Sequence, residues 1–210
     1  MHPTRQEFRD ALAARHGAEY QRRLDDARVA ICGLGGLGSN VAIALARAGV
    51  GCLHLIDYDR VDMSNLNRQQ YKVSQLGELK TEALRQTLEE IAPYCKVETD
   101  AVRLTEENLL SVLSGESIVC EAFDTPFSKA MLVNGVLERL PNAWLVSGNG
   151  MAGTQSANLI QTRRVLPRFF VCGDGVSDIG ECGSLFAARV MACAAHQALT
   201  IVKIIIGEMD

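Results

Sequence analysis

The stretch Val29-Ala30-Ile31-Cys32-Gly33-Leu34-Gly35-Gly36-Leu37-Gly38 decides the fold of this chain. Its first four residues are a continuous apolar run, which is typical of a short strand buried on both faces of a sheet. Gly33, Gly35 and Gly38 then follow the G-x-G-x-x-G spacing of a nucleotide-binding turn. Residues 39–48 have a helix-forming composition. A strand, a glycine turn and a helix in this order predict the first βα unit of a nucleotide-binding domain.

Strands and helices alternate along the rest of the chain. Apolar or alternating runs predict strands at residues 52–56, 97–101, 117–123 and 144–147, and helices at 81–91, 105–113 and 126–140. Residues 154–171 are richer in strand-forming residues, and a long helix closes the chain at residues 185–207. This alternation implies a doubly wound, Rossmann-like α/β fold with a mostly parallel central sheet. Because no linker or repeat divides it, the chain 1–210 is predicted to be a single domain with a helical N-terminal segment, residues 4–27.

Charge and composition narrow the classes of function. With 21 Lys and Arg against 25 Asp and Glu, the formal net charge is −4, so we expect no binding to nucleic acid or to an anionic membrane. The apolar C-terminal helix is interrupted by charged residues, which favours a core helix over a membrane span. The chain starts without an apolar signal sequence, and its seven cysteines include no C-x-x-C pair. We therefore expect a cytoplasmic protein with mostly reduced thiols.

The glycine turn predicts a site for a nucleotide phosphate. Glycine is needed because the turn is tight and a phosphate must approach the backbone closely, and the helix that follows directs its free N–H groups there. Asp57 ends the second predicted strand, 19 residues after Gly38, and is placed to accept hydrogen bonds from ribose hydroxyls. NAD, FAD and ATP all fit such a site.

Three charged residues beyond this turn favour ATP. Arg68 and Lys80 lie in and after a polar segment that follows Asp57 directly, and two cations suit a triphosphate whose α-phosphorus is attacked. Asp124 ends the fourth predicted strand, where a carboxylate beside a triphosphate holds Mg²⁺. Each has a simpler interpretation taken alone: a surface charge, or for Asp124 the cap of the helix that starts at Pro126. Behind one nucleotide turn, the three together favour phosphate chemistry.

These motifs resemble the signature of E1-like adenylating enzymes, the ThiF/MoeB branch of the ubiquitin-activating superfamily. The matching segments are residues 33–38, Asp57-Tyr58-Asp59, Ser64-Asn65-Leu66-Asn67-Arg68-Gln69, Lys80, Asp124 and the closing helix, residues 188–207. Within that family the chain is most similar to the short ThiF type of thiamine-thiazole synthesis. That similarity rests on residues 65–71, Glu121-Ala122-Phe123-Asp124, residues 147–153 and Cys172-Gly173-Asp174.

The resemblance implies a reaction and its partners. A small β-grasp sulfur-carrier protein of the ThiS type presents its C-terminal Gly-Gly carboxylate to ATP, and attack on the α-phosphorus gives carrier acyl-adenylate and pyrophosphate. A sulfur donor, a cysteine desulfurase or a similar enzyme, then allows a thiocarboxylate to form for thiamine thiazole biosynthesis. The family also implies a homodimer, in which an N-terminal arginine can complete the neighbouring site. Arg15, Arg22 and Arg23 lie in that region, and the resemblance does not single out one of them as the family's arginine.

The resemblance further assigns roles to single residues. Arg68, Lys80 and Asp124 form the catalytic set, in which Asn65 joins Arg68 and Lys80 on the phosphates and Asp124 organises Mg²⁺. The nucleotide-binding set is Gly33, Gly35, Gly36, Gly38, Asp57, Asp59, Asn65 and Gln69. Asp57 holds the ribose, whereas Asp59 and Gln69 match the motif without a defined contact.

The cysteines depart from the family pattern. Many relatives hold a structural Zn²⁺ with two C-x-x-C pairs, but here Cys172 and Cys182 stand alone in the matching region, so no zinc is predicted. Either residue is a candidate exposed thiol for sulfur relay. The acidic residues around them should raise a thiol pKa, which argues against a reactive thiolate.

Several alternatives stay open at this stage. Within the class, the substrate could be a molybdopterin-type carrier or a tRNA base, although the net charge does not favour the latter. An NAD-dependent oxidoreductase could use the same glycine turn, but it would leave Arg68, Lys80 and Asp124 without a joint role. A non-catalytic scaffold that binds carrier or nucleotide is disfavoured because these three residues are intact.

Overall fold

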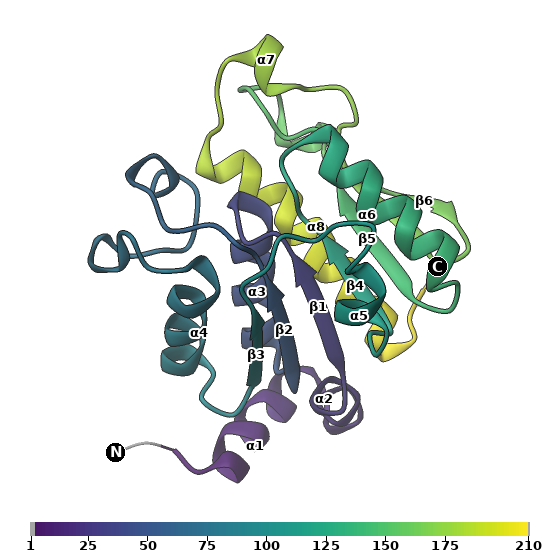
Figure 1. The fold of residues 1–210 in the computed structure, drawn as a ribbon. Coiled ribbons are helices and arrows are strands. Elements are labelled where there is room, and N and C mark those ends of the chain that lie inside the picture. Colours follow the sequence, from purple (N-terminus) through teal and green to yellow (C-terminus); the bar gives the residue numbers. More distant parts are fainter. Residues whose placement is uncertain (1–2, 210) are drawn as a thin grey trace.

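The fold is built on one seven-stranded sheet. A computed structural model describes residues 3–209. The strands are β1 (Arg28–Cys32), β2 (Cys52–Ile56), β3 (Lys96–Asp100), β4 (Ile118–Glu121), β5 (Trp144–Gly148), β6 (Gln161–Leu166) and β7 (Phe169–Gly173). They lie in the order β3-β2-β1-β4-β5-β7-β6, and every neighbouring pair is parallel except the antiparallel pair β6 and β7. The predicted doubly wound α/β fold with a mostly parallel sheet is confirmed (Figure 1).

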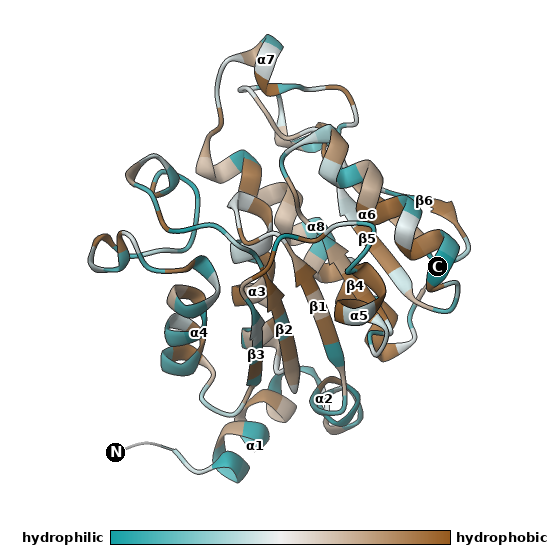
Figure 2. Ribbon diagram, viewed as in Figure 1, coloured by the Kyte–Doolittle hydropathy of each residue, from teal (hydrophilic) through white to brown (hydrophobic). Residues whose placement is uncertain are grey.

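Helices cover both faces of this sheet. One face carries α3 (Gly36–Ala48), α4 (Lys80–Ile91) and α8 (Ala187–Ile206), and the other carries α5 (Leu109–Leu113) and α6 (Pro126–Arg139) (Figure 1). Successive residues of β1 serve the two layers in turn, because side chains alternate along a strand. Ile31 packs in the core on the α3 face, and Cys32 in the core on the α6 face. Figure 2 shows the apolar strands between helices whose outer faces are more polar.

Two short helices precede the sheet. The first, α1 (Arg5–His16), begins with a capping box in which Thr4 accepts a hydrogen bond from the backbone N–H of Glu7. Gly17, with φ of 95°, separates it from α2 (Ala18–Asp25). Both helices lie near the amino ends of β1 and β2, at the opposite edge from the glycine turn (Figure 1).

Three elements differ from the sequence expectations. Helix α3 begins at Gly36, inside the glycine turn, instead of at residue 39. Helix α5 spans only Leu109–Leu113, because residues 105–108 form a separate turn closed by Thr105 and Asn108. The strand-rich segment is a hairpin whose second strand, β7, inserts beside β5, and a four-residue helix, α7 (Ile179–Cys182), follows it.

The apolar C-terminal helix is part of the core. Within residues 3–209, α8 is the one helix long and apolar enough to cross a membrane. It packs along α3 and against β4, β5 and β7, and its buried side includes Cys193, Gln197 and Ile201. The structure therefore accounts for its hydropathy by packing, as predicted.

Candidate nucleotide site

The glycine turn has no room for side chains at two positions. Gly33 has φ of +90°, and a Cβ placed on it would lie 2.8 Å from the carbonyl oxygen of Ala122. A Cβ on Gly38 would lie only 1.8 Å from the carbonyl oxygen of Gly33. These contacts hold β1, the start of α3 and the segment after β4 in direct contact, and they explain why the sequence needs glycine here. The N-terminus of α3 consequently opens at the carboxyl edge of the sheet, where its free N–H groups favour an anion.

Asp57 lies directly beside this turn. Its side chain is buried, with Oδ2 accepting a hydrogen bond of 2.6 Å from the backbone N–H of Leu34 and Oδ1 one of 2.8 Å from that of Asp59. Burial raises the pKa of the Asp57 carboxyl, against the positive charge of Lys80 and the two N–H donors. A carboxylate held at the end of β2 against the glycine turn is the arrangement by which this fold class contacts a ribose.

Lys80 and Asp59 form an ion pair next to Asp57. Lys80 is the first residue of α4, and its Nζ donates to Oδ2 of Asp59 over 2.8 Å. The Lys80 side chain is 7 % exposed, whereas that of Asp59 is 48 % exposed. A phosphate that binds Lys80 would therefore approach an ammonium group that lies next to two carboxylates, those of Asp57 and Asp59.

The polar segment after β2 returns to the glycine turn. It contains two 3₁₀ turns, η1 (Met63–Asn65) and η2 (Val73–Gln75). The aliphatic part of Arg68 lies over Gly36, with Cγ 3.5 Å from the place a Cβ would take there. Gln69 is buried beside Gly35, and within the described residues its Oε1 has no hydrogen-bond partner. Two side chains of the motif thus lie against the turn that would hold the phosphates.

Asn65 is engaged in its own turn. Its Oδ1 accepts a hydrogen bond of 3.1 Å from the backbone N–H of Asp62, completing a capping box around η1. The guanidinium of Arg68 donates back to the carbonyl oxygen of Ser64 and to Oδ1 of Asn67, over 3.1 and 2.8 Å. These bonds orient the segment that carries Arg68.

Three further residues fasten this segment, and sequence reasoning gave them no role. The hydroxyl of Tyr71 donates to the carbonyl oxygen of Leu34 over 2.7 Å, inside the glycine turn. Asn40 donates to the carbonyl oxygen of Arg68, and the hydroxyl of Ser39 accepts from the N–H of Gln70. Their only signal in the sequence is adjacency to the motifs.

Asp124 stands on the other side of the turn, after β4. Its side chain is exposed, and no residue from 3 to 209 makes a hydrogen bond or ion pair with it. The cap of α6 is Thr125, whose hydroxyl accepts from the N–H of Ser128 over 3.2 Å, so the interpretation of Asp124 as the cap is wrong. An exposed carboxylate without a protein partner fits Mg²⁺, which binds through one or two carboxylates and keeps several waters.

The two cysteine candidates differ in exposure. Cys172 lies in β7 and is fully buried, and burial raises the pKa of its thiol. The expectation of an exposed thiol is therefore wrong for Cys172, because the residue belongs to a central strand. Cys182 ends α7 and is partly exposed, next to Gly153.

The N-terminal arginines lie far from the glycine turn of their own chain. Arg22 and Arg23 both pair with Glu19 on α2, over 2.8 and 3.0 Å, and Arg15 is exposed near the end of α1. All three belong to the helices near the amino ends of the strands (Figure 1).

Comparison with known proteins agrees with the fold and with the motifs. The model of the ThiF family matches residues 8–210. The chain is 30 % identical over 197 residues to the adenylyltransferase and sulfurtransferase UBA4 of Candida glabrata, covering 91 % of this chain and 45 % of that protein. It is 32 % identical over 201 residues to the adenylyltransferase and sulfurtransferase MOCS3 of Drosophila yakuba, covering 92 % of this chain and 44 % of that one. This chain thus spans less than half the length of either relative.

Solved structures resemble the chain over nearly its whole length. The tRNA N6-threonylcarbamoyladenosine dehydratase TcdA of E. coli, in complex with ATP, superposes with a TM-score of 0.85 at 25 % identity, covering 97 % of this chain and 95 % of that one. E. coli MccB shares the fold, with a TM-score of 0.72 at 24 % identity, covering 91 % of this chain and 60 % of that one. By its sequence and its fold, the chain belongs to the ThiF family.

Proposed function

We propose that this chain binds ATP with Mg²⁺ and adenylates the C-terminal Gly-Gly carboxylate of a small ubiquitin-like sulfur carrier. The observation that carries the proposal is the set of charges around one glycine turn. The aliphatic part of Arg68 lies over Gly36, Lys80 lies beside the buried Asp57, and the unpaired Asp124 follows the segment packed on Gly33. An oxidoreductase with the same turn has no use for two cations and a metal-binding carboxylate there.

The reaction uses these charges as follows. A carboxylate oxygen of the carrier attacks the α-phosphorus of ATP, and the bond from that phosphorus to the bridging oxygen of pyrophosphate breaks. Negative charge grows on the phosphoryl oxygens and on the leaving pyrophosphate, and preorganised cations stabilise that charge. Arg68, Lys80 and the N-terminus of α3 supply this stabilisation, and Asn65 and Gln69 complete the phosphate contacts. When bound, Mg²⁺ neutralises the triphosphate, and Asp124 would hold it.

The nucleoside part of ATP is assigned to the other half of the site. Asp57 accepts from the ribose hydroxyls, since each of its oxygens keeps a free lone pair after the single backbone hydrogen bond it accepts. Asp59 keeps Lys80 in place next to this carboxylate. The backbone at Gly33, Gly35, Gly36 and Gly38 approaches the phosphates closely.

The carrier we favour is of the ThiS type, for thiamine thiazole biosynthesis. The support is the set of short ThiF-type motifs at residues 65–71, 121–124 and 147–153. The names of UBA4, MOCS3 and TcdA do not refer to thiamine, so the carrier of a different sulfur pathway is the first alternative. Adenylation of a tRNA base is a second candidate, favoured by the likeness to TcdA and opposed by the net charge of −4.

Other parts of the proposal complete the pathway. A cysteine desulfurase or similar donor supplies the sulfur after adenylation, and the partly exposed Cys182 is the candidate relay thiol. We also propose that the chain works as a cytoplasmic homodimer.

The test is ATP–pyrophosphate exchange with Mg²⁺ and three substrates in parallel: a ThiS-type carrier, a molybdopterin-type carrier and a tRNA that contains N6-threonylcarbamoyladenosine. The control is each carrier lacking its terminal Gly-Gly. We expect exchange with the ThiS-type carrier that is lost without Gly-Gly. Exchange with the molybdopterin-type carrier alone would assign that carrier to this chain in place of the ThiS type. Exchange with tRNA alone would support the second candidate. No exchange, together with tight NAD binding, would refute adenylation.

A further inference from the structure

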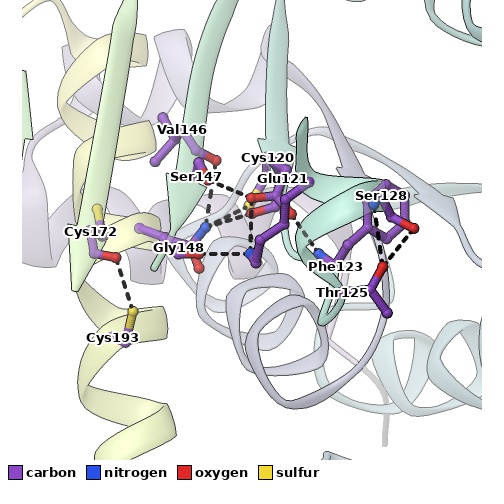
Figure 3. Close-up of polar contacts among 12 residues, drawn as sticks. Cys120, Glu121, Phe123, Thr125, Ser128, Val146, Ser147, Gly148, Cys172 and Cys193 are labelled. Carbon is purple, nitrogen blue, oxygen red and sulfur yellow. Dashed lines mark hydrogen bonds and ion pairs between the residues drawn. The ribbon is translucent and has the colours of Figure 1, made fainter. Parts of the chain in front are cut away.

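A buried charge pair lies beneath the candidate site at the carboxyl ends of β4 and β5. Glu121, the last residue of β4, is completely buried. Its carboxylate meets the ammonium group of Lys129, which comes from the first turns of α6, with Nζ 3.1 and 3.2 Å from the two carboxylate oxygens. Figure 3 shows Glu121 between Ser147 and Phe123 at the centre of this group.

Hydrogen bonds at this pair involve β4, β5, α6 and α8. The carboxylate also accepts from the backbone N–H of Phe123 over 2.7 Å and from the hydroxyl of Ser147. Lys129 donates in addition to the carbonyl oxygen of Gly148 over 2.7 Å, at the end of β5. From α8, the side-chain amide of Gln197 donates to the carbonyl oxygen of Glu121 over 2.9 Å. Four elements are thus fixed relative to one another at one residue.

Stability alone is a poor explanation for such a pair. The Glu121 side chain is fully buried and that of Lys129 is 22 % exposed, and removing charges from water costs so much that a buried ion pair is often no more stabilising than apolar side chains of similar volume. What the pair provides is a defined geometry, because each of its hydrogen bonds has a fixed direction.

That geometry bears on the segment that carries Asp124. The bond from the N–H of Phe123 to Glu121 closes a tight turn, and this turn places Ala122 and Phe123 against Gly33. Asp124 is the next residue, and α6 begins two residues later at Pro126 and is held by Lys129. No described residue makes a hydrogen bond or ion pair with the Asp124 side chain, so its position depends on the anchors before and after it.

We infer that the Glu121–Lys129 pair is a positioning device of the adenylation site: it fixes the backbone that carries Asp124 and supports Gly33. The inference rests on the proposed function, since it assigns Asp124 to the metal-bound triphosphate. Glu121 and Lys129 act through Asp124 and Gly33, and neither touches the reacting atoms.

The test is a double-mutant cycle between Glu121→Gln and Asp124→Ala, read by ATP–pyrophosphate exchange. A misplacement of about 1 Å can cost about 100-fold in rate, so we expect Glu121→Gln alone to lower kcat at least ~10-fold, with the KM for ATP changed less than ~3-fold and the Mg²⁺ requirement raised. In the Asp124→Ala background, Glu121→Gln should lower the logarithm of kcat by less than about a third of the amount by which it lowers it in the unmodified protein. The reason is that the effects of substituting residues that act as a unit are not additive.

Two further variants separate positioning from stability. Glu121→Gln with Lys129→Met removes both charges, so its melting temperature should recover relative to either single variant while kcat stays low. Glu116→Gln removes a different buried carboxylate at the far end of β4 and should leave kcat unchanged below its melting temperature. Recovery of kcat together with stability in the double variant, or additive losses with Asp124→Ala, would overturn the positioning role.

The failure of this inference can be told from failure of the proposed function. Absence of exchange in the unmodified protein would refute adenylation, and the same cycle is then read by calorimetry of ATP binding with Mg²⁺. Non-additive losses of Mg²⁺-dependent ATP affinity would still support the pair as a positioning device for Asp124. Additive losses would reject it.

Discussion

Strand β4 has a buried carboxylate at each end, and the two serve different purposes. Glu116, just before the strand, accepts hydrogen bonds from Arg28 over 2.9 and 2.8 Å and pairs with His54 over 2.7 Å. Glu121, at its end, pairs with Lys129 and accepts from the backbone of Phe123. Both side chains are almost inaccessible to solvent, at 2 and 0 % exposure.

The surroundings, and not the burial of charge, distinguish the two ends. Around Glu116 the neighbouring charges are paired with one another inside the molecule, although its Oε2 has no hydrogen-bond partner among the described residues. Around Glu121 the network ends at a glycine turn, beside the exposed carboxylate of Asp124, to which no described residue makes a hydrogen bond or ion pair. A buried ion pair is therefore weak evidence of a site, whereas one that adjoins an exposed, unpaired carboxylate at the open edge of the sheet is stronger evidence.

The largest expected effect is a loss of stability, without a loss of activity, when the carboxylate at the amino end of β4 is changed. Glu116→Gln leaves Arg28 and His54 facing an uncharged amide, so we expect a loss of about 3 kcal/mol in the free energy of unfolding, measured by urea denaturation. Glu98, the partly exposed partner of Arg28, provides the matched control, because Glu98→Gln should cost less than about 1 kcal/mol. A fall in kcat with Glu116→Gln at a temperature where it is folded would break the comparison.

The second prediction concerns the carboxyl end. Asp124→Ala and Arg68→Ala should each lower ATP–pyrophosphate exchange at least ~100-fold, equivalent to about 2.7 kcal/mol of transition-state stabilisation. The melting temperature of Asp124→Ala should stay near that of the unmodified protein, since the Asp124 side chain is exposed and has no hydrogen bond or ion pair with a described residue. Near-normal exchange in both variants would contradict the assigned roles.

The third prediction is that the stability contributed by the cluster around Glu116 depends on pH. Burial of the His54 ring lowers its pKa, but hydrogen bonds to Glu116 and Asp100 outweigh burial and leave the pKa above its ordinary value. The charged ring therefore adds stability that is fully present below the unfolded-state pKa of about 6.5, and this stability is lost as the pH rises through the folded-state value.

We expect the free energy of unfolding to fall as the pH is raised above neutrality and this fall to shrink in His54→Gln. Urea denaturation across that range measures it, with His196→Gln as a control on a histidine whose ring is hydrogen-bonded to the hydroxyl of Thr162 and not to a carboxylate of the described residues. An unchanged pH profile in His54→Gln would show that the ring does not carry the charge.

The smallest expected effect is on the glycine turn. Tyr71→Phe removes the hydroxyl that donates to the carbonyl oxygen of Leu34, a single buried hydrogen bond. The loss should be about 1 kcal/mol in stability, with a KM for ATP raised a few-fold, because the turn is less firmly held. A rise in KM without loss of stability would place Tyr71 in the binding of ATP itself.

The sequence predicts local features of this molecule better than its long-range ones. The glycine turn, the strand ends that carry Asp57 and Asp124, and the buried C-terminal helix all follow from periodicity and from motifs, because each depends on neighbouring residues. The place of β7 beside β5 does not, since strand order is set by packing across the sheet. The role of Glu121 does not follow from the sequence either: a glutamate at the end of an apolar run carries no sign that it will be buried and paired with a lysine eight residues later.

Thr125 and Cys172 show the same limit at single residues. Asp124 and Thr125 are both good capping residues, and only the geometry of α6 assigns the cap to Thr125. Cys172 precedes glycine and aspartate, a composition typical of an exposed loop, yet it lies in β7 and is buried. In both cases, moving the boundary of a helix or strand by one residue changes the role that the residue at that boundary would have.

The most direct test of adenylation is mass spectrometry of the carrier itself. A ThiS-type carrier is incubated with the protein, ATP and Mg²⁺, without a sulfur donor, next to the same reaction with Asp124→Ala. We predict that the unmodified protein adds one adenylyl group to the carrier's C-terminus and releases pyrophosphate, and that Asp124→Ala adds at most about one hundredth as much in the same time. A carrier of unchanged mass in both reactions, under conditions in which the protein binds ATP, would contradict the account.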